Sequence, residues 1–525
     1  MFFRRVVMLA ALGLSLSSTL INPSAGRAAG GATVLSVTVL PNPPSMGGVV
    51  RLKLQLRNDS SAPWSANDLV RLTWKGANGS AIEDTRRLGK DMTVGSSITL
   101  TLTTLAPAAA GDFTLVTELD TGGKRMPIGD PNQFHLGGFL FSGRGNGHGL
   151  GMSQWGARGR AAAGQGYRTM LSDYYRGTRI ETRDTSGLVR VALTHGAVDL
   201  SRAWPRLFGP LPMVAGPVTV EGAPLKVTAE EVLAFGTNTS GQPVAFIASP
   251  GGSPKGARVV ISGTLTVHPD GAAGIRTNLL ETMGADFRSG AEQRRYGGVL
   301  QIVPRGAATV LPVNVLPIED YLKGVVPAEM PAYWGVEALK AQAVAARTYA
   351  LRKILLGGSG DFDLEGNEFD QAYGGLTESR PTTDDAVSAT KGQVLTSGGH
   401  LIDALYTSSD GGHSENSEYG FIHWNHGLRP AASLPYLRGI VDPLDQAPGW
   451  QVGPLSPADA ATILRDNGDD LGDRLNGIDI LQTGPSGRVL GVRLRGSSAS
   501  EEVSGPYLRF LFSLPDTLVT IAGGP

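Results

Sequence analysis

Between about Thr33 and Gly137, apolar and polar residues alternate in short stretches bounded by Pro, Gly, Asn or Asp. The stretches read VLSVTVL, VRLKLQLRN, LVRLTWKG, SSITLTLTTL and GDFTLVTELDTGG. An alternation with a period of two is typical of a strand that buries one face. Because no helical segment interrupts these strands, they predict an antiparallel β-sandwich over residues 30–137. No catalytic cluster falls within it, so we expect a binding or spacer domain.

The pattern changes in residues 138–187, which open with a glycine-rich stretch, GRGNGHGLGM. Two stretches, Ala157–Ala163 and Tyr167–Tyr175, are expected to be helical, and Gly164 and Gly166 separate them.

Strand-like stretches return in residues 188–295, where Pro and Gly concentrate in two places. This predicts a β-rich insertion or subdomain with surface loops. Residues 296–525 combine a mainly helical segment, Ile318–Leu356, with strands and a mixed tail. Pro331 suits the first turn of a helix there. We therefore expect residues 138–525 to form an α+β domain after the sandwich.

Composition narrows the classes of function. A chain of 525 residues suits about three domains at roughly 150 residues each. The formal net charge is -1 and no block of Lys and Arg follows the first residues, so nucleic acid is not an expected partner. The absence of cysteine excludes disulfides, thiolate metal sites and a lipid-modified cysteine.

The first 29 residues have the pattern of a secretory signal peptide. Arg4 and Arg5 precede an apolar stretch, Val6–Leu16, and small residues follow, with a cleavage position after Ala28. The alternative is an uncleaved membrane anchor, although the apolar stretch is shorter than the roughly 20 residues that span a bilayer. We expect a secreted protein that works outside the cytoplasmic membrane, in the cell wall or facing the periplasm.

One acidic residue stands out in PIEDYLKGVVPAEMPAYWGVEALKAQAVAARTYAL, because Glu329 is flanked by apolar residues and prolines. A carboxylate in such surroundings resists ionisation, as a general acid near neutral pH requires. The alternative is that Glu329 is a helix-start acid that interacts with the helix dipole.

The charged residues that follow share one helical face. Glu337, Lys340 and Arg347 are related by steps of three and four. They form either a solvated, salt-bridged face or, because this alanine-rich helix should be buried, a charged stripe in which the cations Lys340 and Arg347 need partners.

Cleavage of a glycoside by hydrolysis normally needs two carboxylates. Glu319 and Asp320 are candidates for the second, although they resemble a solvent-facing helix start. With a single carboxylate, the acid would protonate the leaving oxygen and then take a proton from a hydroxyl of the sugar itself.

Three long segments are similar to the SpoIID/LytB family of stage II sporulation protein D and amidase enhancers. They are GRGNGHGLGMSQWGARGRAAAGQGYRTMLSDYYRGTRI, the stretch around VVPAEMP quoted above, and DQAYGGLTESRPTTDDAVSATKGQVLTSGGHLIDALYTSSDGGHSE with PYLRGIVDPLD. The N-terminal layout resembles immunoglobulin-like accessory modules.

The resemblance implies a lytic transglycosylase. Such enzymes cleave the bond between N-acetylmuramic acid (MurNAc) and N-acetylglucosamine (GlcNAc) in peptidoglycan, preferably in strands stripped of peptides, and leave a 1,6-anhydro-MurNAc end. Glu329 would be the catalytic acid, and Lys340 and Arg347 would orient it or bind glycan. The other implied substrate-binding residues are Tyr406, Ser408, Ser409, His148, Ser153 and Gln154, of which the last three line the groove or fix a turn by internal hydrogen bonds.

The chain departs from the familiar arrangement in the order of its segments. GHGLGMSQWGA often follows the EMP region but precedes it here, as in a circular permutation, so we expect the two segments to meet in space. Some members bind zinc through cysteine and histidine. This chain has only His413, His423 and His426 close together, and we expect neither a metal nor another cofactor.

Two further functions remain open. The protein could be a wall-binding partner that stimulates an N-acetylmuramoyl-L-alanine amidase without being an enzyme, or a glycoside hydrolase that releases a reducing end.

Overall fold

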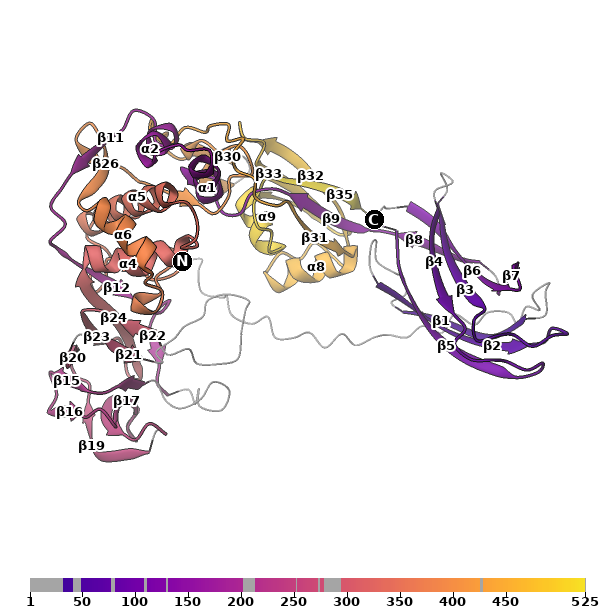
Figure 1. Cartoon of the computed structure of the whole chain (residues 1–525), viewed down its shortest axis with the longest axis horizontal. Helices are drawn as coiled ribbons and strands as arrows, with labels where there is room; N and C mark the ends of the chain where they lie inside the picture. The colour runs from indigo at the N-terminus through magenta and orange to yellow at the C-terminus, as the bar shows by residue number, and fades with distance from the viewer. Residues whose placement is uncertain are drawn as a thin grey trace.

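The computed structural model describes residues 32–40, 49–76, 81–107, 111–128, 131–201, 213–251, 253–271, 274–277, 294–424 and 428–524. The predicted signal peptide and His426 lie outside these residues. A β-sandwich stands at one end of the molecule and a β-rich subdomain at the other, with the C-terminal module and the main group of helices between them (Figure 1). In the described residues, no helix is long and apolar enough to cross a membrane.

The predicted N-terminal sandwich is confirmed. Two antiparallel sheets share one core, to which Leu52 and Leu54 contribute from one sheet and Val70 and Trp74 from the other. Residues of β2 are alternately exposed and buried along its length, as the period of two predicts. The strands of the first sheet are β1 (Ala32–Leu40), β2 (Val49–Asn58) and β5 (Ser97–Leu105). Those of the second are β4 (Ala81–Arg87), β3 (Leu69–Gly76), β6 (Gly111–Thr121), β7 (Lys124–Pro127) and β8 (Asn132–Leu136).

The β-rich subdomain consists of two sheets around a shared core that includes Val214, Val267 and Leu300. It runs on to Pro317, because the last two strands of this region pair within the larger sheet. The larger sheet contains β12 (Leu188–Ala192), β13 (Val198–Asp199), β15 (Val218–Glu221), β16 (Leu225–Val227), β20 (Leu265–Pro269), β23 (Val299–Pro304), β24 (Thr309–Pro317) and β25 (Leu364–Glu365). The other contains β14 (Met213–Ala215), β17 (Val232–Thr237), β18 (Pro243–Ala248), β19 (Pro254–Val260), β21 (Ile275–Thr277) and β22 (Arg294–Tyr296).

The helices surround α5 (Val336–Leu355), whose alanines at 341, 343, 345 and 346 are fully buried. Small side chains let the neighbouring helices approach its backbone closely. These neighbours are α1 (Gln154–Ala162), α2 (Tyr167–Tyr174), α4 (Ile318–Glu329) and α6 (Pro381–Ala389).

The helical segment predicted from Ile318 to Leu356 is broken in the middle. Helix α4 ends at Glu329, and residues 330–335 form a turn before α5. The prediction that Pro331 begins a helix is therefore wrong. Pro331 lies in this connection, and Gly335 is the residue that precedes α5.

The C-terminal module is joined to the start of the α+β region by β9 (Gly138–Gly143). This strand pairs with β31 (Trp450–Leu455) on one side and β35 (Val519–Gly524) on the other. The rest of the module contains β32 (Leu475–Thr483), β33 (Val489–Gly496), β34 (Ser500–Ser504), α8 (Pro457–Asp466) and α9 (Gly505–Leu511).

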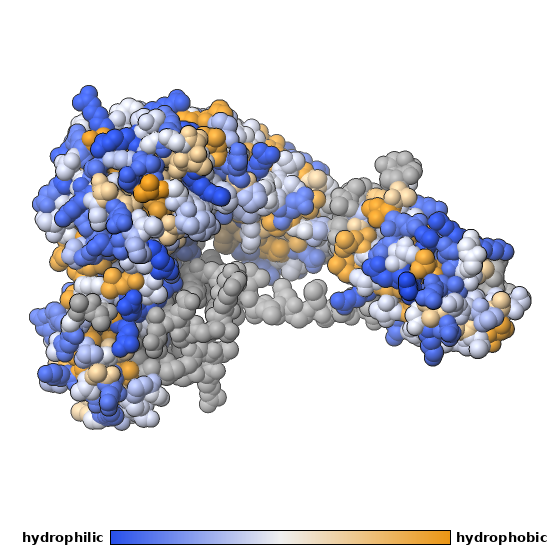
Figure 2. Space-filling model, viewed as in Figure 1, coloured by the Kyte–Doolittle hydropathy of each residue, from blue (hydrophilic) through white to orange (hydrophobic). Residues whose placement is uncertain are grey.

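Shorter elements connect these parts: β11 (Arg179–Thr182), β26 (Gln393–Ser397), β27 (His400–Leu401), η1 (Gly375–Thr377), α7 (Ser417–Gly420), β29 (His423–Trp424) and β30 (Leu428–Arg429). Polar residues cover most of the visible surface. Apolar residues gather in smaller patches, one of them on the side of the sandwich that faces the rest of the chain (Figure 2).

Candidate active site

Two segments that are remote in sequence meet at a short parallel pair of strands. Strand β10 (Met152–Ser153) pairs with β28 (Tyr406–Thr407), so that Met152 lies opposite Tyr406. Helix α1 begins directly after β10, and the Ser153 hydroxyl caps it by accepting a hydrogen bond from the Gly156 N–H. The GHGLGMSQWGA segment therefore lies against the ALYTSSDGG segment. It also meets the EMP region, as expected, because Gln154 donates a hydrogen bond to Glu329.

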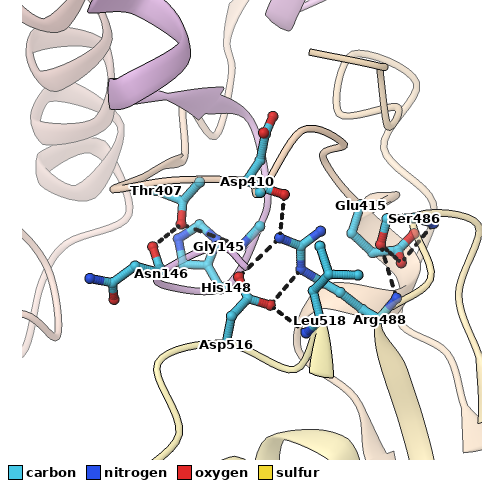
Figure 3. Close-up of polar contacts among 12 residues, drawn as sticks. Gly145, Asn146, His148, Thr407, Asp410, Glu415, Ser486, Arg488, Asp516 and Leu518 are labelled. Carbon is cyan, nitrogen blue, oxygen red and sulfur yellow. Dashed lines mark hydrogen bonds and ion pairs between the residues drawn. The ribbon is translucent and has the colours of Figure 1, made fainter. Parts of the chain in front are cut away.

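The glycines before β10 allow the backbone to lie against a buried ion pair (Figure 3). Arg488 donates to both carboxylate oxygens of Asp516, at 2.9 and 3.0 Å, and to the Asp410 carbonyl at 2.9 Å. A Cβ at Gly145 would lie 2.4 Å from Asp516 Oδ2, and one at Gly149 would lie 2.3 Å from Arg488 Cζ. Both glycines also have a positive φ. The glycines therefore permit close backbone contact on both sides of His148.

His148 lies in this glycine-rich turn and is held by it. Its Nδ1 accepts a hydrogen bond from the Leu150 N–H at 3.0 Å, and its ring packs 5.2 Å from that of Phe421. Burial, together with the positive charges of Arg509 and Arg488, lowers the pKa of His148 to about 4. The ring is thus neutral near pH 7, and its internal hydrogen bond supports the turn.

Ser153 and Ser409 join the two segments through one carboxylate. Their hydroxyls donate to Asp445 Oδ2 at 2.9 and 2.8 Å, and both residues are buried. The partly exposed Ser408 is held differently, because its carbonyl accepts from the Trp155 N–H at 3.0 Å. Ser153 and Ser409 therefore hold the scaffold of the site in place.

Glu329 lies at the centre of the site, where three neutral donors from three separate segments reach its carboxylate. The Ala372 N–H and the Tyr406 hydroxyl donate to Oε1 at 2.7 and 3.2 Å, and the Gln154 amide donates to Oε2 at 3.0 Å. Within the described residues, no cation forms an ion pair with Glu329. Burial raises the pKa of Glu329 above its usual value, although the three hydrogen bonds oppose the shift.

The helix-start interpretation of Glu329 is wrong. Glu329 is the last residue of α4, and Met330 follows as its C-cap. The negative end of a helix dipole disfavours a carboxylate, so this position adds to the physical reasons for a raised pKa.

A second set of hydrogen bonds holds these donors. The Gln371 amide donates to the Tyr406 hydroxyl at 3.0 Å, and its carbonyl accepts from the buried Tyr321 hydroxyl at 3.0 Å. The Gln154 amide also lies 3.5 Å from Gln342 Oε1. Burial and the nearby Glu329 carboxylate raise the pKa of Tyr406 well above 10, so its hydroxyl remains a donor.

Sequence reasoning missed Gln342, Gln371 and the Ala372 N–H. None of them carries a charge, and a backbone N–H leaves no signal in a sequence. Gln342 and Gln371 are fully or almost fully buried polar residues, but that fact becomes visible only in the folded chain.

The two predicted cations lie in different surroundings. Lys340 pairs with Glu337 at 2.7 Å and lies over the Tyr167 ring at 5.8 Å. Arg347 has 0% of its surface exposed and pairs with Glu319 at 2.8 Å, besides donating to the Val387 carbonyl at 3.1 Å. The expectation that Arg347 contacts glycan directly is wrong, because the side chain has no free surface.

The two candidates for a second carboxylate are also engaged. Glu319 accepts from the Thr185 hydroxyl and the Gly392 N–H as well as from Arg347, and Arg347 contributes to lowering its pKa. Asp320 pairs with Lys323 at 2.8 Å. Across the described parts of the chain, no group of three or more His, Cys, Asp and Glu is arranged to hold a metal ion.

Comparison with known proteins finds similarity over the segment that contains Glu329. The family model SpoIID, described as Stage II sporulation protein, matches residues 307–397, which include Glu329 and its donor at Ala372. The Amidase enhancer of Bacillus subtilis (strain 168) is 43% identical over 129 residues, covering 25% of this chain and 16% of the relative.

Two other relatives match segments of similar length. Stage II sporulation protein D of the same strain is 31% identical over 149 residues, covering 26% of this chain and 41% of the relative. An uncharacterized protein of Brachyspira hyodysenteriae (strain ATCC 49526 / WA1) is 37% identical over 146 residues, covering 28% and 37%. Each match spans less than half the length of the relative. The segment that holds Glu329 is therefore similar to the SpoIID family and to proteins named Amidase enhancer and Stage II sporulation protein D.

Proposed function

We propose that the protein is an exported lytic transglycosylase of the bacterial cell wall. It cleaves the MurNAc–GlcNAc bond of peptidoglycan strands without stem peptides and leaves a 1,6-anhydro-MurNAc end. The pattern of the first 29 residues supports export, and the family supports a role at the wall.

The observation that carries the proposal is the state of the Glu329 carboxylate. It has a raised pKa, neutral donors and no cationic partner among the described residues. A carboxyl that keeps its proton nearer to neutral pH is suited to general acid catalysis. Its three donors come from different segments, so the carboxylate has a fixed orientation in the folded protein.

The proposed reaction uses this one group twice. The protonated Glu329 gives its proton to the oxygen leaving C1 of MurNAc, and the bond between C1 and that oxygen breaks. The C6 hydroxyl of the same sugar forms the new bond to C1, and its proton passes to the Glu329 carboxylate. The carboxyl is protonated again at the end, and no water is consumed.

The engagement of Glu319 and Asp320 favours this route over hydrolysis. Hydrolysis needs a second carboxylate to activate water or to act as a nucleophile. Glu319 is held by Arg347, and Asp320 by Lys323.

A second candidate function is stimulation of an N-acetylmuramoyl-L-alanine amidase. The similarity to a protein named Amidase enhancer favours it. In that case the surface around Glu329 would bind glycan without cleaving it.

The experiment is digestion of denuded glycan strands, with the products identified by mass. We expect the wild type to release anhydro ends and Glu329→Gln to release them about 1,000-fold more slowly, since general acid catalysis contributes about 100- to 10,000-fold. Glu337→Gln is the matched control. It makes the same chemical change at a carboxylate paired with Lys340 and should retain the wild-type rate.

Other products would decide between the alternatives. Reducing ends would show hydrolysis. Unchanged strands together with faster turnover of an added amidase would overturn the enzymatic proposal in favour of the enhancer.

A further inference from the structure

A stacked arginine lies beside the candidate site, on the same helix as one of the donors to Glu329. The rings of Trp155 and Trp334 meet edge to face at 5.5 Å. The guanidinium carbon of Arg158 lies 4.6 Å from the centre of the Trp155 ring and 5.5 Å from that of Trp334. Two aromatic side chains thus fix the position of this cation.

Among the described residues, the charge of Arg158 has no anionic partner. The residue is exposed, and within the described chain its side chain forms neither an ion pair nor a hydrogen bond. Arg160, two residues further along α1, is buried and paired with Asp173 and Asp442 at 2.8 and 3.2 Å. A guanidinium stacked on rings still presents donors along its edge, and a carboxylate can accept two of them at once.

The position of Arg158 relative to Glu329 follows from the helix. Gln154, which donates to Glu329 at 3.0 Å, and Arg158 are four residues apart in α1, so they share a face about 6 Å apart along the axis. Trp334 lies in the turn that follows Glu329. Arg158 therefore lies about one helical turn from Gln154, the residue that donates a hydrogen bond to the Glu329 carboxylate.

Two further aromatic features lie in the segment that contains Trp334. The indole N–H of Trp334 is buried and has no hydrogen-bond partner in the part of the chain that the structure describes. The neighbouring Tyr333 is 84% exposed. Tyr333 directly precedes Trp334, one of the two rings over which Arg158 lies. An exposed ring and a cation in this part of the surface suit a sugar that carries an anionic group, because a ring can contact the apolar face of a sugar while a cation binds its charge.

We propose that Arg158, held by Trp155 and Trp334, forms a subsite for the carboxylate of an acidic sugar, namely the lactyl carboxylate of a MurNAc unit next to the bond that is cleaved. The inference rests on the proposed function for the identity of the strand. In a strand that carries peptides this carboxyl is an amide and has no charge. Arg158 is thus a specificity-determining residue that favours strands without peptides.

The experiment measures binding in the Glu329→Gln background, so that it does not depend on cleavage. The probes are denuded glycan strands and the same strands after conversion of their lactyl carboxyls to methylamides. We expect the amidated strands to bind about tenfold more weakly, the size of effect that a charge-assisted hydrogen bond can give. Adding Arg158→Gln should reduce binding of the untreated strands to that lower level and leave binding of the amidated strands unchanged.

Arg168→Gln is the matched control. Arg168 is also an exposed arginine stacked on an aromatic ring, 5.1 Å from the centre of Tyr167, but it already donates to Gln393 at 3.2 Å. This variant should still discriminate between the two kinds of strand. Equal losses for both kinds of strand in Arg158→Gln, or no loss for either, would overturn the proposal.

The result also separates this inference from the proposed function. Discrimination that depends on Arg158 in a protein whose wild type releases no anhydro ends would support the subsite while contradicting the transglycosylase. Anhydro ends released equally from both kinds of strand, with Arg158→Gln unchanged, would contradict the subsite alone.

Discussion

The two ends of helix α4 carry the same residue in opposite states. Glu319, in the first turn, pairs with the buried Arg347 and accepts two further hydrogen bonds, and its pKa is lowered. Glu329, at the last position, has three neutral donors and a raised pKa. The helix dipole favours the charge of Glu319 and opposes that of Glu329. Glu319 is therefore a structural carboxylate and Glu329 a candidate acid, because the two residues differ in their position along the helix and in whether a cation pairs with them.

The largest effect expected from this comparison is on stability. Glu319→Gln leaves the fully buried Arg347 without its counter-charge and should lower the free energy of unfolding by about 3–5 kcal/mol. Glu329→Gln removes a carboxylate that has no cationic partner among the described residues, so at neutral pH it should leave stability unchanged or raise it. Urea denaturation of both variants measures the difference. Only the transition of the part that contains α4 should move, since a chain with several cores does not unfold in one step.

An equal decrease in the free energy of unfolding of the two variants would mean that Glu319 and Glu329 do not differ in the way described. A smaller loss in Glu319→Gln than in Glu329→Gln would reverse the expected order.

A smaller effect is expected at one donor to Glu329. Tyr406→Phe removes the hydroxyl that donates to Oε1 and leaves the Gln371 amide without that acceptor. The rate of release of anhydro ends should fall about tenfold, the scale of one hydrogen bond to a charged group. The pKa of Glu329 should rise further, because the lost bond favours the ionised form.

The pH dependence of the rate checks this prediction. The limb that reports Glu329 should move to higher pH in Tyr406→Phe. A limb that moves to lower pH, or a rate equal to that of the wild type, would mean that the hydroxyl does not act on Glu329.

The parts of the fold that depend on local pattern could be predicted from the sequence. The alternation in VRLKLQLRN matches the exposed and buried residues of β2 along its whole length. The alanine-rich stretch forms the buried helix α5, which ends at Leu355 before Gly357 and Gly358. In both cases the side chains themselves determine which face is buried.

The environment of the site could not be predicted in the same way. The charged stripe of Glu337, Lys340 and Arg347 shares a helical face, yet only the fold shows that Arg347 is sealed against Glu319 while Lys340 stays near the surface. The hydrogen bond from Gln154 to Glu329 joins two segments that are far apart in the sequence. The sequence did not indicate that α4 ends at Glu329, because residues typical of a helix continue beyond it into α5.

The most direct test of the account is a site-resolved titration of Glu319 and Glu329, for example by carboxyl ¹³C NMR on protein labelled at glutamate, with Glu329→Gln used to assign the signal. Glu329 should titrate above the ordinary glutamate value and Glu319 below it. If Glu329 titrated at or below the value of Glu319, then burial without a cationic partner among the described residues would not keep Glu329 available as an acid.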